Sequence, residues 1–128
     1  MPRQKSDRIT PLELEIMNVL WQLGSANVQT VQQILKRELA YTTVQTMLTV
    51  LHRKGKVKRT LKNKAYVYRP ALSKSKVTGH AVGELINHWF GGSAEGLVMN
   101  LIEARHLTPK KLAHLNRMVA EGERDAQD

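Results

Sequence analysis

Residues 40–70 constrain the fold more than any other part of the chain. They read AYTTVQTMLTVLHRKGKVKRTLKNKAYVYRP. Apolar residues at helical spacing, a stop at Gly55 and two short β-leaning runs predict an amphipathic helix followed by a basic hairpin. A helix that can enter a groove, beside a positively charged ribbon, is typical of a winged helix-turn-helix. We therefore expect a mainly α chain with a small β-wing.

The helix predicted at about residues 42–54 has two chemically different faces. At about 100° per residue, one side is apolar and holds Val44, Met47, Leu48 and Leu51. The nearly opposite side is polar and holds Thr42, Gln45, Thr46, Thr49 and Arg53. Threonine is a poor helix former because its branched side chain loses rotamer freedom, so this enrichment indicates a role other than helix stability.

Threonine and glutamine are suited to contacts with DNA. Threonine hydroxyls bind phosphates, the threonine methyl packs on thymine, and glutamine can bond the edge of adenine. We predict that Gln45, Thr46 and Thr49 contact DNA, with Thr42, Thr43 and Arg53 as further candidates. An alternative for either Thr42 or Thr43 is that it only caps the helix.

The hairpin is predicted from strands at 57–62 and 65–70 joined by an Asn63–Lys64 turn. Val57, Leu61 and Val67 are expected to face the core, and Lys58, Arg59, Lys62 and Lys64 the outer face and tip. A lysine-rich edge also prevents strand-to-strand aggregation. The residues expected to hold phosphates or an adjacent minor groove are Arg59, Lys62 and Lys64 of the wing and Arg3 and Lys5 of a basic arm at 1–8.

Two helices are predicted before this region. Thr10, Pro11 and Glu13 form a capping box with proline at the first helical position, and Gly24 ends the helix. Asn27 caps a second, short helix that should end near Arg37 or Glu38. The inner faces are expected to hold Leu12, Ile16, Val19, Leu20 and Leu23 in the first helix and Val28, Val31, Ile34 and Leu35 in the second.

The positive charge is confined to one half of the chain. Residues 1–72 hold 13 basic and 4 acidic side chains, a net of +9, whereas residues 73–128 hold 7 of each, a net of 0. A basic face on one module is typical of nucleic-acid binding, although a lysine-rich solvated surface is the alternative.

Residues 73–128 predict three helices, which begin at Ser73, Ser93 and Thr108. Such short helices make a poor independent core, so we expect a homodimerisation region; the alternative is that they pack on their own N-terminal module. The predicted domains are thus 1–8, 9–72 and 73–128. The residues expected at the dimer interface are Val82, Leu85, Ile86, Trp89, Phe90, Leu97, Leu101, Leu112 and Leu115.

Six segments carry a resemblance that covers the chain from about Thr10 to Met118. They read PLELEIMNVLW (11–21), GSANV (24–28), AYTTVQTML (40–48), KGKVKR (54–59), AYVYRP (65–70) and GLVMNLIEA (96–104). In their order and spacing the chain resembles the BlaI/MecI penicillinase-repressor family of winged-helix regulators. The resemblance implies a dimeric, cytoplasmic bacterial repressor and an operator with TACA and TGTA half-sites.

The resemblance also implies control by a membrane β-lactam sensor protease, which cuts family members between an asparagine and a phenylalanine. Asn100 matches the asparagine, whereas Leu101 stands where phenylalanine is usual. Cleavage at this bond is therefore a hypothesis. Asn100 could equally be an ordinary polar residue on an outer face.

Other classes of function find little support. The chain has no cysteine, so we expect no disulfide, no thiolate metal site and no copper sensing of the kind found in related repressors. The five histidines lack metal-ligand spacing, and no catalytic set is evident, so no metal, cofactor or enzyme activity is expected. No apolar run approaches the ~20 residues that span a bilayer, and the N-terminus lacks a signal-peptide core. The remaining alternative is a winged-helix protein-interaction module that does not bind specific DNA.

Overall fold

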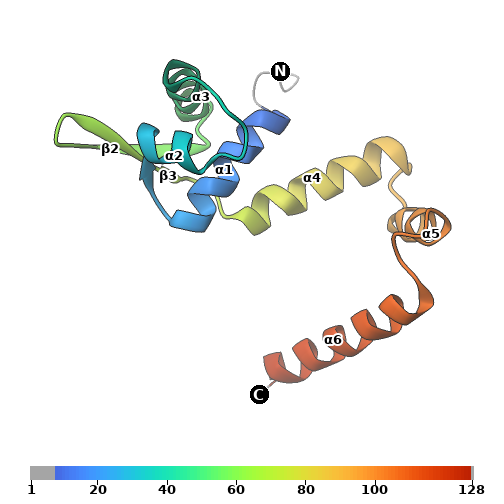
Figure 1. Cartoon of the computed structure of the whole chain (residues 1–128). Coiled ribbons are helices and arrows are strands. Elements are labelled where there is room, and N and C mark those ends of the chain that lie inside the picture. Colours follow the sequence, from blue (N-terminus) through green and yellow to red (C-terminus); the bar gives the residue numbers. More distant parts are fainter. Residues whose placement is uncertain (1–7, 128) are drawn as a thin grey trace. The chain divides into compact units, whose positions relative to one another are not determined.

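The computed structural model describes residues 8–127. In chain order the elements are α1 (Pro11–Leu23), β1 (Ala26–Asn27), α2 (Val28–Ile34), α3 (Tyr41–Arg53), β2 (Val57–Lys62), β3 (Ala65–Pro70), α4 (Lys74–Trp89), α5 (Ala94–Glu103) and α6 (Pro109–Gln127) (Figure 1). This confirms the mainly α architecture with a small β-wing. The chain divides into two compact units, the first ending at Gly79 and the second beginning at His80. The predicted domain limits at residues 8 and 72 stay predictions.

The local signals at the start of α1 act as the sequence predicts. The Thr10 hydroxyl accepts a hydrogen bond from the Glu13 amide at 3.2 Å, and the Glu13 carboxylate accepts one from the Thr10 amide at 2.8 Å. Pro11 occupies the first turn, and Gly24 ends the helix at φ 86°. The capping box is therefore confirmed, because each partner satisfies a backbone donor that the helix cannot.

The second helix is shorter than predicted. Asn27 caps it by accepting a hydrogen bond from the Thr30 amide at 2.8 Å, as expected. It ends at Ile34 instead of near Arg37 or Glu38, because Leu35 adopts an extended backbone with ψ 134°. The Gln32 side chain then donates to the Leu39 carbonyl at 3.0 Å, and Leu35 and Leu39 both pack on the core from the segment that follows α2.

The third helix begins and ends by backbone geometry. Its N-cap is Ala40, with no side-chain cap, so the alternative that Thr42 or Thr43 caps the helix is wrong. At the other end Gly55 has φ 77°. The Gly55 amide donates to the His52 carbonyl at 3.0 Å and the Lys56 amide to the Leu51 carbonyl at 2.9 Å, which is a Schellman motif.

The sheet has the strand order β1-β3-β2, and all pairs are antiparallel. Lys62 pairs with Ala65, so the hairpin loop is Asn63–Lys64 alone, with φ of 50° and 68°. Two consecutive positive φ values are typical of a type I′ turn. Figure 1 shows the β2–β3 hairpin extending beyond the helices of the first unit.

The core of the first unit lies between α1, α2, α3 and the base of the hairpin. Leu61 was expected there but is 61% exposed, and Tyr68, which was not expected there, is 1% exposed. Both lie on the same face of the hairpin, because Arg59 pairs with Tyr68 and Leu61 with Tyr66. Leu61 is exposed since it lies next to the tip, beyond the helices. The largest fully buried side chains are Tyr68, Ile16, Met17, Leu20, Leu48, Leu51, Val31 and Val44.

A buried ion pair joins the start of α1 to the end of α3. Glu13 is 4% exposed, and its two carboxylate oxygens accept hydrogen bonds from the Lys54 ammonium at 2.9 and 3.1 Å. The same ammonium donates to the Arg8 carbonyl at 2.8 Å. Burial tends to raise the pKa of Glu13, but hydrogen bonds from the Thr10 amide and Lys54 outweigh it and hold this pKa below its ordinary value.

The starts of α4, α5 and α6 were predicted correctly. The hydroxyls of Ser73, Ser93 and Thr108 each accept a hydrogen bond from an amide three residues on, at 3.2, 2.9 and 3.2 Å. No side chain from residue 80 to residue 125 is buried. Within residues 8–127, no helix is both long and apolar enough to cross a bilayer.

Candidate nucleic-acid interface

The outward side of α3 is a continuous polar surface, which we call the threonine face. It is defined by Thr42, Thr43, Gln45, Thr46, Thr49 and Arg53, all of which are exposed. The opposite side of the helix is anchored by Val44, Leu48 and Leu51, each 0% exposed. The structure thus brings together all six residues of α3 that the sequence singles out, on a helix fixed from behind by the core.

The side chains of the threonine face differ in what they can still bind. The Thr49 hydroxyl donates to the Gln45 carbonyl, one turn earlier, at 2.9 Å. In the described part of the chain, the hydroxyls of Thr42, Thr43 and Thr46 have no hydrogen-bond partner, and neither does the side-chain amide of Gln45. These groups are therefore available to a ligand without breaking a bond in the protein.

The basic residues of the wing lie on both faces of the hairpin. Lys58 and Lys62 share one face, and Lys64 lies in the turn. Arg59 lies on the opposite face, where its guanidinium is 4.1 Å from the centre of the Tyr66 ring. The expectation that Arg59 joins the lysines on one outer face is therefore wrong, because successive residues of a strand point to opposite sides.

Sequence reasoning missed a further basic residue of the wing. Arg69 pairs directly with Lys58 and is exposed. Its guanidinium donates to the Thr60 hydroxyl at 3.2 Å, which holds it on the lysine-bearing face of the hairpin. Alternation along β3 could have placed Arg69 there once Tyr68 was recognised as buried. The two arm residues Arg3 and Lys5 lie outside the described residues.

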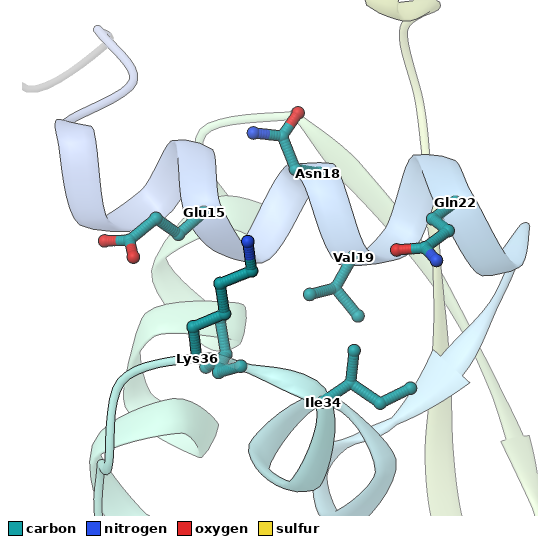
Figure 2. Close-up of a pocket in the computed structure, with 7 residues that line it drawn as sticks. Glu15, Asn18, Val19, Gln22, Ile34 and Lys36 are labelled. Atoms are coloured by element: carbon teal, nitrogen blue, oxygen red, sulfur yellow. The ribbon is translucent and has the colours of Figure 1, made fainter.

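A separate groove lies between α1 and the end of α2. Its volume is about 360 Å³. Figure 2 shows Val19 and Ile34 facing each other across it, with polar side chains of α1 and Lys36 at the rim. Glu15 at this rim forms an ion pair with Arg37 at 3.2 Å. The groove contains no histidine and no pair of carboxylates, and within residues 8–127 no three acidic or histidine side chains are grouped to hold a metal ion.

The residues expected at a dimer interface are accessible in the single chain. Trp89 is 78% exposed, and Val82, Leu85 and Leu115 are 41%, 39% and 43% exposed. Ile86, Phe90, Leu97, Leu101 and Leu112 are half-buried. Asn100 is exposed and lies in the last turn of α5, three residues before its end at Glu103.

Comparisons with known proteins bear on both units. The model of the penicillinase repressor family matches residues 9–121. The chain is 27% identical to the penicillinase repressor of Bacillus licheniformis, over 92% of this chain and 94% of that one. It is 26% identical to the methicillin resistance regulatory protein MecI of Mammaliicoccus sciuri, over 90% of this chain and 95% of the other.

Two solved structures are similar to the chain. The DNA-binding domain of the repressor BlaI is 32% identical with a TM-score of 0.50, and the match covers 57% of this chain and 92% of that domain. The YusO protein of Bacillus subtilis is 16% identical with a TM-score of 0.51, covering 94% of this chain and 78% of that one, which shows similarity of fold alone. Together with the family match, these findings confirm the resemblance inferred from the sequence motifs. The chain belongs to the penicillinase repressor family.

Proposed function

We propose that this protein is a transcriptional repressor that binds a palindromic DNA operator as a homodimer and inserts α3 into the major groove of each half-site. The observation that carries the proposal is the threonine face, because its side chains are exposed while the same helix is anchored in the core. Among residues 8–127, the hydroxyls of Thr42, Thr43 and Thr46 have no hydrogen-bond partner. The names of the relatives, which are penicillinase and methicillin-resistance regulators, support a repressor.

The anchoring of α3 explains how it can recognise DNA at little conformational cost. Its inner residues are completely buried, and Lys54, directly after its last turn, is tied to Glu13 of α1. Its first turn has no side-chain cap, unlike those of α1, α2 and α5, so backbone amides there remain available to a phosphate oxygen. We expect Gln45 and Thr46 to read base edges in this arrangement.

The wing supplies contacts that do not depend on sequence. Lys58, Lys62, Lys64 and Arg69 are exposed cations on one hairpin, in the half of the chain that carries the whole net charge of +9. Lysine and arginine on phosphates release condensed counterions, so affinity should fall steeply with salt. These residues set the register of the protein on the duplex, whereas α3 selects the sequence.

The second unit supports the proposed homodimer. Three large apolar side chains of this unit are exposed in the single chain: Trp89 is 78% exposed, Val119 60% and Met118 52%. A second copy would cover these surfaces, and a two-fold axis would place two α3 helices on the two halves of a palindrome. Repression would then follow from exclusion of the polymerase.

We further propose that release from DNA follows cleavage of the Asn100–Leu101 bond by a membrane sensor protease. The Asn100 carbonyl accepts a hydrogen bond from the Ala104 amide at 2.9 Å, and the Leu101 carbonyl accepts from the amides of His106 and Leu107. Helix ends open locally more easily than helix centres, which favours access of a protease to this bond. Mass spectrometry of the protein after incubation with the cognate protease tests this, and cleavage at another bond would contradict it.

The proposed repressor function is tested by fluorescence anisotropy with the full chain. One duplex carries a TACA/TGTA dyad and a second carries the same bases scrambled, each titrated at several salt concentrations. We expect tight, salt-dependent binding that prefers the dyad, with two protomers for each duplex. Equal, weak binding to both duplexes would contradict the proposal and favour the protein-interaction module.

A further inference from the structure

The threonine face contains two kinds of threonine, and the difference bears on which base each one reads. The single hydroxyl proton of Thr49 is donated to the Gln45 carbonyl at 2.9 Å. The hydroxyls of Thr42, Thr43 and Thr46 have no such partner in the described chain. Threonine in a helix often makes this bond to the carbonyl four residues earlier, and a hydroxyl so engaged is no longer free as a donor.

The engaged hydroxyl limits the contacts open to Thr49 on DNA. Phosphate oxygens accept hydrogen bonds and never donate them. The same is true of four acceptors in the major groove, which are N7 and O6 of guanine, N7 of adenine and O4 of thymine. Thr49 cannot donate to any of these atoms while it holds the Gln45 carbonyl. The methyl of this exposed residue remains, and the apolar group that a major groove offers to a methyl is the C5-methyl of thymine.

We infer that Thr49 is a specificity-determining residue that recognises a thymine through its methyl group, whereas Thr46 acts through its hydroxyl. The inference rests on the proposed function and names the chemistry of one contact within it. It also explains why a β-branched residue stands at position 49: serine would keep the bond to the Gln45 carbonyl and lose the methyl.

The test uses the full chain and the TACA/TGTA duplex, with each thymine replaced in turn by deoxyuridine, which lacks only the C5-methyl. The variants are Thr49→Val and Thr49→Ser, with Thr46→Val and Thr46→Ser as the matched pair one turn earlier. Both positions are exposed, and threonine, valine and serine have similar helix propensities. Circular dichroism checks that each variant remains folded. Anisotropy gives the Kd of every combination.

The two positions should respond in opposite ways. We expect Thr49→Val to bind like the wild type. Thr49→Ser should bind about fourfold more weakly for each half-site, which corresponds to one methyl removed from an apolar contact, and so about 16-fold more weakly to the whole dyad. One deoxyuridine removes the contact from one half-site only, so it should weaken the wild type about fourfold and leave Thr49→Ser unchanged. Thr46→Ser should bind normally, and Thr46→Val about fivefold more weakly for each half-site, or about 25-fold for the dyad, because its hydroxyl is lost.

Other outcomes overturn the inference. If Thr49→Val binds weakly and Thr49→Ser binds normally, Thr49 uses its oxygen, for example by accepting from adenine N6 or cytosine N4. If no deoxyuridine affects the wild type while the dyad is still preferred over scrambled DNA, the thymine contact is absent and the proposed repressor function stands. If the wild type does not prefer the dyad at all, both proposals fail together.

Discussion

The ion pair between Glu13 and Lys54 offers the sharpest test of how α3 is held. At 2.9 Å and an effective dielectric constant of about 20, the attraction between the two charges is about 6 kcal/mol. Desolvation offsets much of this, so the net value of the intact pair is small. Removing one partner is different, because the other charge then stays buried. Such deletions cost about 3–5 kcal/mol.

We therefore expect Lys54→Met to lower the free energy of unfolding by about 3 kcal/mol at pH 7, at the lower end of that range. Glu13 is 4% exposed and keeps the hydrogen bond from the Thr10 amide at 2.8 Å, which lessens the cost. Urea denaturation followed by circular dichroism, at one fixed protomer concentration, measures the difference. The matched control is Glu15→Gln, which breaks the more exposed pair of Glu15 and Arg37 at 3.2 Å and should cost less than about 1 kcal/mol.

The pH dependence provides a second readout of the same pair. The pKa of Glu13 in the folded chain is lowered from its ordinary value of 4.5. Its contribution to stability is therefore present above pH 4.5 and is lost as the pH falls through the lowered pKa. In Lys54→Met the Glu13 carboxyl can protonate more readily. The difference in unfolding free energy between the wild type and Lys54→Met should therefore become smaller as the pH falls. This account of the pair would be refuted if Lys54→Met lost no more unfolding free energy than Glu15→Gln. It would also be refuted if the difference between the wild type and Lys54→Met did not change with pH.

The remaining predictions concern DNA binding, two glycines and the second unit. Gln45→Ala should lower binding to the dyad by about 1–3 kcal/mol for each half-site, with little effect on scrambled DNA. Lys62→Ala should weaken binding to both duplexes and reduce the salt slope by about one unit for each protomer bound. Anisotropy that shows the two variants behaving alike would contradict the division of roles. Gly55→Ala should destabilise by about 1–3 kcal/mol in urea, because φ is 77° while nothing lies within 4 Å of the added methyl. Gly79→Ala, in a helix and equally open, should stabilise by about 0.5–1 kcal/mol, and equal effects at the two glycines would be evidence against conformational strain. Trp89→Glu should shift a homodimer to monomer in sedimentation velocity, since Trp89 is 78% exposed in the single chain, and an unchanged dimer would exclude this surface.

Signals that act over three or four residues could be read from the sequence alone. The capping box of Thr10 and Glu13 and the cap at Asn27 join groups three residues apart. The stop at Gly55 and the two-residue turn at Asn63–Lys64 depend on a positive φ that glycine, and to a lesser degree asparagine, tolerates. The polar and apolar sides of α3 follow from helical periodicity. Because these signals are local, α1, α3 and the two strands of the hairpin were predicted with nearly correct limits.

Contacts between distant parts of the chain were decided only by the tertiary structure. Lys54 reaches Glu13 across 41 positions, a pair that no spacing rule indicates. Leu61 and Tyr68 share a hairpin face, but one lies beyond the helices and the other over the core, so alternation alone could not separate them. The end of α2 and the two-residue strand β1 likewise depend on packing against α1 and β3. The difference between Thr46 and Thr49 likewise appears only in the three-dimensional structure, because the sequence does not show which threonine hydroxyl already donates a hydrogen bond within the protein.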